Sequence, residues 1–194
     1  MWFRGAAIRP VPPHAVVSRE VLDRVEHELA DGELGAKSEL DDAFERFEQT
    51  QPALAQAAAD ILARPLDDTA LALGYFLTIT VWLAFERAFG TRLGEVSEEA
   101  RDAAVAALDL EEQLRKNHAE EPLDLEDVMM LEQPGVLAFI HEHVEAALEP
   151  QDEEEHEVDV DDVHVVYRSI LVETLALSHA VSPTSGTVPR EMLA

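Results

Sequence analysis

The sequence predicts an all-α protein of about eight helices, arranged as two related four-helix halves around two central apolar helices. Three observations lead to this prediction. Capping residues and prolines recur through the chain at intervals that suit helices of ordinary length. Glycine is sparse, with 8 in 194 residues, and the Asn-Gly turns typical of β-hairpins are absent. Two long apolar segments, at about residues 69–85 and 163–181, occupy matching places late in each half.

Three amphipathic helices are expected before the first apolar segment. Residues 1–17 are predicted to form an extended arm, because three prolines among them disfavour helix. Ser18 is the predicted N-cap of a helix that ends at Gly32, and Ser38 is the predicted N-cap of the next. Pro52 then starts a third helix, since proline suits the first turn of a helix but disfavours helix in the residue before it.

The first apolar segment is a 17-residue stretch, Thr69 to Phe85, without a charged side chain. Asp67 or Asp68 is expected to cap it, and Gly90 to end it. Its β-branched and aromatic residues favour strand, but a lone strand would have no partner for its hydrogen bonds. A membrane span is the alternative, yet the segment is short for a span and its flanks are acidic rather than basic. We therefore predict a buried core helix.

The second half repeats this order of signals. Ser97 is the predicted N-cap of a long helix, a short helix is expected at 123–132, and Pro134 starts the next. Asp161 or Asp162 is the predicted cap of the second apolar helix. The second half would therefore contain the same four elements as the first.

Residue matches between the halves indicate an internal repeat. Pro52 and Pro134, each preceded by glutamine, are 82 positions apart, and Tyr75 and Tyr167 are 92 positions apart. The offset grows where an acidic loop, Asp152 to Asp162, is inserted. Alanine-rich and leucine-rich helices also align by chance, so these few identities make the repeat a hypothesis.

The predicted domain organisation follows from these elements. An N-terminal arm (1–17) precedes one all-α globular domain (18–182), and a flexible tail (183–194) follows it. Within the domain the repeat units would be 18–90 and 97–181.

The net charge of −27, from 41 acidic and 14 basic side chains, restricts the classes of partner. Nucleic acids and anionic membranes are bound through lysine and arginine, so we expect no direct nucleic-acid binding and no membrane binding. A basic protein partner remains open. Solubility or a salty habitat would explain the same charge without any partner.

The sequence contains no recognisable catalytic motif. Cysteine is absent, which excludes disulfides, thiolate metal sites and catalytic thiols. The nucleophile elbow of hydrolases and the glycine-rich phosphate loops are also missing. No cofactor is expected. Because the N-terminus lacks a continuous apolar stretch of signal-peptide length, we predict a cytoplasmic protein.

The densest group of metal-ligating residue types lies in one predicted helix. His141 and Glu145 would share a face at a spacing of four, and Glu142 and Glu145 at a spacing of three, whereas His143 would point elsewhere. These residues make His141, Glu142 and Glu145 the candidate metal ligands. Histidines on a solvated helix face are the alternative explanation.

The positions of two further side chains, Glu173 and Trp82, are predicted from the residues around them. Glu173 interrupts the second apolar helix, and we expect it to lie at the helix margin and to reach solvent; if it were buried, its pKa would rise unless an arginine paired with it. Trp82 is expected in the core.

Nothing in the sequence identifies a biochemical activity. The leading hypothesis is a non-enzymatic interaction or scaffold protein, compatible with a homodimer, that presents an acidic face to a basic protein. The alternatives are a carboxylate and histidine metal-binding helical enzyme or sensor, and an acidic mimic of nucleic acid.

Overall fold

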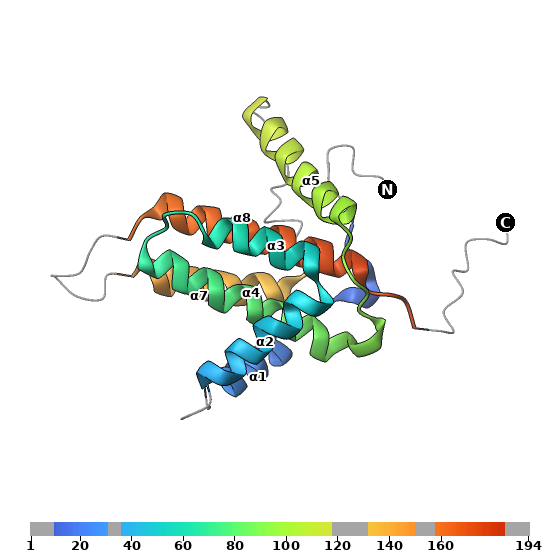
Figure 1. Cartoon of the computed structure of the whole chain (residues 1–194). Helices are drawn as coiled ribbons and strands as arrows, with labels where there is room; N and C mark the ends of the chain where they lie inside the picture. The colour runs from blue at the N-terminus through green and yellow to red at the C-terminus, as the bar shows by residue number, and fades with distance from the viewer. Residues whose placement is uncertain (1–9, 31–35, 118–131, 150–157, 185–194) are drawn as a thin grey trace.

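The computed structural model describes residues 10–30, 36–117, 132–149 and 158–184 (Figure 1). These residues form seven α-helices and no strand, which confirms the all-α prediction. The helices are α1 (Arg19–Ala30), α2 (Ala36–Thr50), α3 (Pro52–Leu62), α4 (Asp68–Phe89), α5 (Glu98–Asn117), α7 (Pro134–Leu148) and α8 (Val160–Ala180). Almost all of the predicted helix at 123–132, most of the acidic loop and the tail beyond Thr184 lie outside the described residues.

The two apolar helices, α4 and α8, pack together at the centre and run parallel (Figure 1). At their N-termini, Asp67 Oδ2 accepts a hydrogen bond from the Asp159 amide at 3.1 Å, and Asp162 Oδ2 accepts one from the Asp67 amide at 2.8 Å. Beyond their C-termini, the Gly94 amide donates to the Ala180 carbonyl at 3.0 Å. Because both pairs of ends are joined, the helices point the same way.

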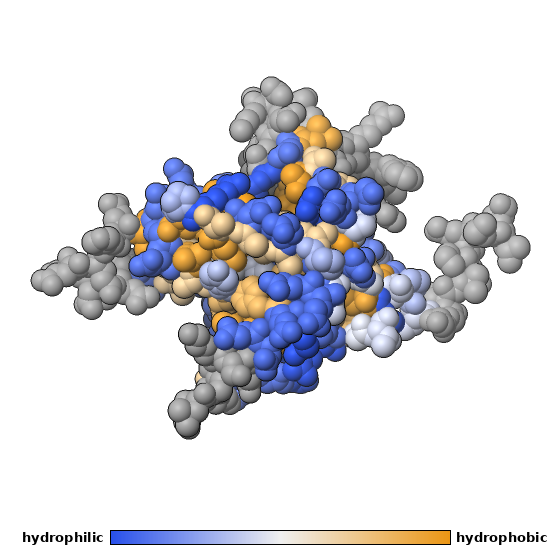
Figure 2. Space-filling view, viewed as in Figure 1, coloured by the Kyte–Doolittle hydropathy of each residue, from blue (hydrophilic) through white to orange (hydrophobic). Residues whose placement is uncertain are grey.

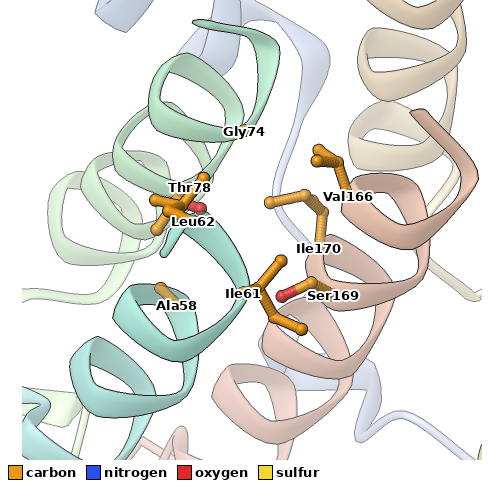
Figure 3. Close-up of a pocket in the computed structure, with 8 residues that line it drawn as sticks. All are labelled: Ala58, Ile61, Leu62, Gly74, Thr78, Val166, Ser169 and Ile170. Carbon is orange, nitrogen blue, oxygen red and sulfur yellow. The ribbon is translucent and has the colours of Figure 1, made fainter. Parts of the chain in front are cut away.

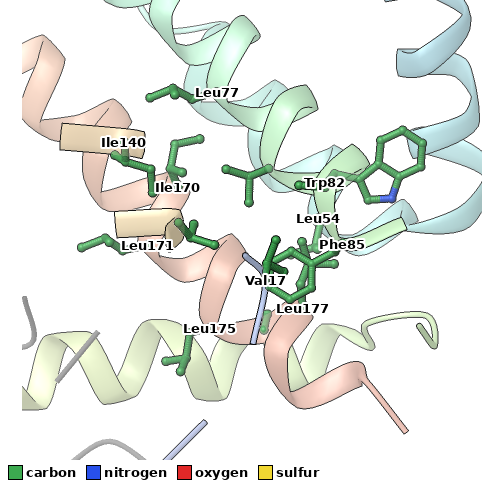
Figure 4. Close-up of a cluster of buried hydrophobic side chains, with 14 of the residues drawn as sticks. Val17, Leu54, Leu77, Trp82, Phe85, Ile140, Ile170, Leu171, Leu175 and Leu177 are labelled. Carbon is green, nitrogen blue, oxygen red and sulfur yellow. The ribbon is translucent and has the colours of Figure 1, made fainter. Parts of the chain in front are cut away.

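The remaining helices cover this central pair. The α3 and α7 helices each contact both α4 and α8, α1 packs on α4 and α7, α5 packs on α8 and α3, and α2 packs on α4. Side chains from these helices form one buried apolar core (Figure 4). Trp82 is 1% exposed and its ring centroid lies 5.3 Å from that of Phe47, so its predicted core position is confirmed.

The first apolar helix has the ends that were predicted. Asp67 caps α4 by accepting the Ala70 amide at 2.9 Å, and Gly90 stops it with a positive φ of 52°. By length and composition the segment Asp68–Arg92 could cross a membrane. However, 67% of its most apolar window is buried among the other helices, as in the core helix of a soluble protein.

Two predicted caps are wrong. Asp159 rather than Asp161 or Asp162 caps α8, since its side chain accepts hydrogen bonds from both of their amides and leaves them in the first turn. The α2 helix begins at Ala36, so Ser38 lies within it instead of capping it. Alanine and lysine are good helix formers, which allows the earlier start.

The two Gln-Pro breaks are structural joints with the same backbone conformation. Gln51 (φ −136°, ψ 56°) and Gln133 (φ −132°, ψ 55°) precede α3 and α7, and both side chains are buried. Gln51 Oε1 accepts from the Val96 amide at 2.9 Å, and its Nε2 donates to the Gly94 carbonyl at 3.0 Å. Gln51 therefore holds the segment that leads into α5.

Gln133 holds the segment before α1 in a similar way. Its Oε1 accepts from the Val17 amide at 3.0 Å, and its Nε2 donates to the Ala15 carbonyl at 2.7 Å and to Ser178 Oγ at 2.9 Å. The described part of the N-terminal arm is consequently built into the core, with Val11, Ala15 and Val17 buried and one 3-10 turn at Pro13–Ala15.

Candidate functional site

The predicted metal ligands all lie on α7, but their side chains engage different neighbours. His141 Nε2 lies 3.1 Å from the Tyr167 hydroxyl of α8, Glu142 accepts a hydrogen bond from Arg19 of α1, and Glu145 is exposed. Within the described residues, no group of three histidine or acidic side chains is placed to hold a metal ion. The geometry therefore adds no support to the metal hypothesis, which metal analysis of the purified protein would test.

His143, which was not among the predicted metal ligands, joins three helices. Its Nε2 lies 3.0 Å from Glu26 Oε1 of α1, and its Nδ1 lies 2.9 Å from the Phe139 carbonyl. The imidazole also stacks near Phe139 and Phe76, with ring centroids 4.3 and 5.0 Å away. These contacts fix α1 and α4 against α7, which is a structural role.

Glu173 is buried, and the prediction that it reaches solvent is wrong. Glu173 is only 5% exposed, because α8, which carries it, packs against α3, α4, α5 and α7. Within the described part of the chain, Glu173 Oε1 has no hydrogen-bond partner. Burial raises the pKa of the Glu173 carboxyl well above its ordinary value of 4.5.

A small pocket opens between α3, α4 and α8 (Figure 3). Gly74 lets the helices approach closely there, since a Cβ at this position would lie 2.7 Å from Leu62 Cδ2. The Thr78 and Ser169 hydroxyls are the polar groups of an otherwise apolar lining. Its volume of about 10 Å³ is roughly the room that one water molecule needs, far below the roughly 300 Å³ at which small-molecule pockets begin. The pocket is too small to bind a metabolite without rearrangement.

The most distinctive property of the surface is its uncompensated negative charge. Among the described residues, the buried acidic side chain is Glu173 alone, and the others are at least partly exposed. Several arginines are already used in ion pairs within the chain: Arg19 with Asp23 and Glu142, Arg46 with Glu86, Arg87 with Glu28, Arg101 with Asp102, and Arg168 with Asp109. Exposed pairs of this kind contribute little stability, but they leave fewer cations to offset the remaining carboxylates.

Hydrophilic residues cover α1 and α2 in Figure 2. On α2, the exposed carboxylates that form no ion pair within the described residues are Asp41, Asp42, Glu45 and Glu48, and we name this group the acidic surface of α2. Arg46, the α2 base whose side chain is described, points to Glu86 and lies over the Trp82 ring. The acidic surface of α2 is therefore a candidate site for a macromolecular contact.

Comparison of this chain with protein-family models, with curated proteins and with solved structures finds no match.

Proposed function

We propose that this protein is a non-enzymatic interaction or scaffold protein that presents the acidic surface of α2 to a basic protein partner. The observation behind this proposal is that Arg46 bonds to Glu86 and lies over Trp82, while the α2 carboxylates are exposed and form no ion pair within the described residues. Concentrated charge of one sign accelerates encounter with an oppositely charged partner and rejects partners of like charge. Lysine-rich or arginine-rich proteins of the cytoplasm are therefore the class of partner proposed.

We also propose that the chain contains the predicted internal repeat. Gln51 and Gln133 share one backbone conformation, and each holds the segment before the first helix of the opposite unit. Asp67 and Asp159 are matching caps of the two central helices. The first helix of each unit, α1 or α5, packs on its central helix. A scaffold built this way would carry related surfaces on opposite sides of one core.

The experiment compares two variants that each remove three negative charges. The α2 variant carries Asp41→Asn, Glu45→Gln and Glu48→Gln. The α5 control carries Glu95→Gln, Glu98→Gln and Glu99→Gln, three exposed carboxylates just before and at the start of α5. Each immobilised protein captures partners from a lysate at low salt and is then washed at about 0.3 M salt, where the Debye length falls below 8 Å.

The proposal expects basic proteins on the wild type and on the α5 control, their loss from the α2 variant, and their release by the salt wash. The proposal is refuted if partners stay bound at high salt, or if they bind the α2 variant as strongly as they bind the α5 control.

A further inference from the structure

Among the described residues, one face of α4 is covered along only half of its length. Its side chains recur at spacings of three and four, so they line one stripe of the helix: Asp68, Ala72, Tyr75, Ile79, Trp82 and Glu86. The α2 helix covers the second half, where Phe47 packs against Trp82 and Arg46 bonds to Glu86 at 3.0 Å. In the first half, Asp68, Ala72 and Tyr75 are exposed.

The aromatic pair Phe44 and Tyr75 lies where the described side chains of α2 stop covering α4. The Phe44 ring of α2 meets the Tyr75 ring edge-on, with centroids 5.4 Å apart and an interplanar angle of 72°. Phe44 is half-buried against the core, whereas Tyr75 remains 42% exposed. Because Phe44 holds the tyrosine in place, a partner would lose little side-chain freedom by packing on it, and tyrosine is a frequent energetic centre of interfaces.

The acidic surface of α2 borders this aromatic pair. Asp41 and Glu48 lie three residues before and four after Phe44, so they share its side of the helix, and Glu45 lies between them. Arg46 lies on the opposite flank, bonded to Glu86. The outcome is an exposed aromatic edge with carboxylates on its α2 side and Asp68 at its end.

We propose that this surface docks a basic amphipathic helical segment of a protein partner. Its apolar side chains would pack on Tyr75 and Ala72, and its lysines and arginines would face Asp41, Glu45 and Glu48. Charge complementarity selects this occupant, since an amphipathic helix with a basic face offers both chemistries at helical spacing. The inference rests on the proposed function and adds an apolar anchor to it.

The test uses a fluorescently labelled synthetic peptide of leucine and lysine with helical amphipathic spacing, and a second peptide with serine in place of leucine. Fluorescence anisotropy at low salt measures the binding of each. We expect the leucine peptide to bind more tightly, and Tyr75→Ala to weaken it about tenfold, as the loss of an interface hot spot does. Ala72→Arg should also weaken it, by adding a cation and bulk without disturbing a packed side chain.

Matched controls lie on α5, where Val105 and Ala103 are also exposed. Val105→Ala and Ala103→Arg should leave the affinity of the leucine peptide within about twofold of wild type. Circular dichroism melts confirm that each variant is folded, and Ala72→Arg carries the test if Tyr75→Ala does not fold.

The outcomes separate this inference from the proposed function. If both peptides bind equally, or Tyr75→Ala and Ala72→Arg bind as their controls do, the docking surface is wrong while the charge-based function stands. If neither peptide binds at low salt, both proposals fail.

Discussion

Gln133 offers the sharpest test of how this fold is held together. Replacing it with methionine keeps its length and removes its hydrogen bonds to the Val17 amide and the Ala15 carbonyl, two buried backbone groups. Each unsatisfied buried group costs about 1–3 kcal/mol, so Gln133→Met should lower the free energy of unfolding by about 2–6 kcal/mol. The loss at Ser178 should be smaller, because its hydroxyl still donates to the Thr174 carbonyl at 2.7 Å.

Gln51→Met is the matched variant. It frees the amide of the buried Val96, but the Gly94 carbonyl belongs to an exposed residue and can bind water instead. We therefore expect a loss of about 1–3 kcal/mol, smaller than at Gln133. Urea unfolding followed by circular dichroism measures both values. A loss below about 1 kcal/mol at Gln133, or a larger loss at Gln51, would refute the idea that these side chains act as joints.

Three further predictions follow from charge and packing. The melting temperature should rise between about 0.05 and 0.5 M salt, because a net charge of −27 repels itself and salt screens it; a flat or falling curve contradicts this. Burial raises the pKa of Glu173 in the folded state, so wild-type stability should fall as pH rises above 4.5 toward that pKa. Glu173→Leu removes this titrating group. Unfolding free energies at several pH values should therefore show the variant becoming more stable relative to wild type as pH rises. A difference that does not change with pH would count against the burial of Glu173. Gly135→Ala places a Cβ 2.7 Å from the Arg19 amide nitrogen, so it should lower the free energy of unfolding by about 1–3 kcal/mol. At Gly74 the nearest atom is the mobile end of the Leu62 side chain, so the melting temperature of Gly74→Ala should lie within a few degrees of wild type.

Local signals were sufficient for most of the helical framework. Asp67 and Gly90 delimit α4 as expected, and Ser97 caps α5 through its hydroxyl, which accepts the Ala100 amide at 3.2 Å. These features depend on hydrogen bonds within three or four residues, which is the range over which a sequence can be interpreted directly. Where several capping residues compete, as before α8, local rules gave the wrong aspartate.

The long-range features were beyond such rules. Gln51 and Gln133 were interpreted as chain breaks, although their side chains bond to segments 45 and 116 residues away. The repeated glutamine before proline was the available signal for this role. Glu173 was misplaced because a helical wheel shows which residues share a face, but not how many neighbours surround the helix. The Glu26 contact of His143 likewise depends on how α1 crosses α7.

The acidic side chains of this protein lie in two different physical settings. Parallel packing of α4 and α8 places two helix N-termini side by side, and their partial positive charges repel. Asp67 and Asp159 cap these ends, and Asp162 accepts the Asp67 amide, so the acidic residues offset a cost of the topology. The carboxylates of the acidic surface of α2 cap no helix and form no ion pair within the described residues. The proposed basic partner would supply the cations that these carboxylates lack within the described residues, beside the exposed Tyr75.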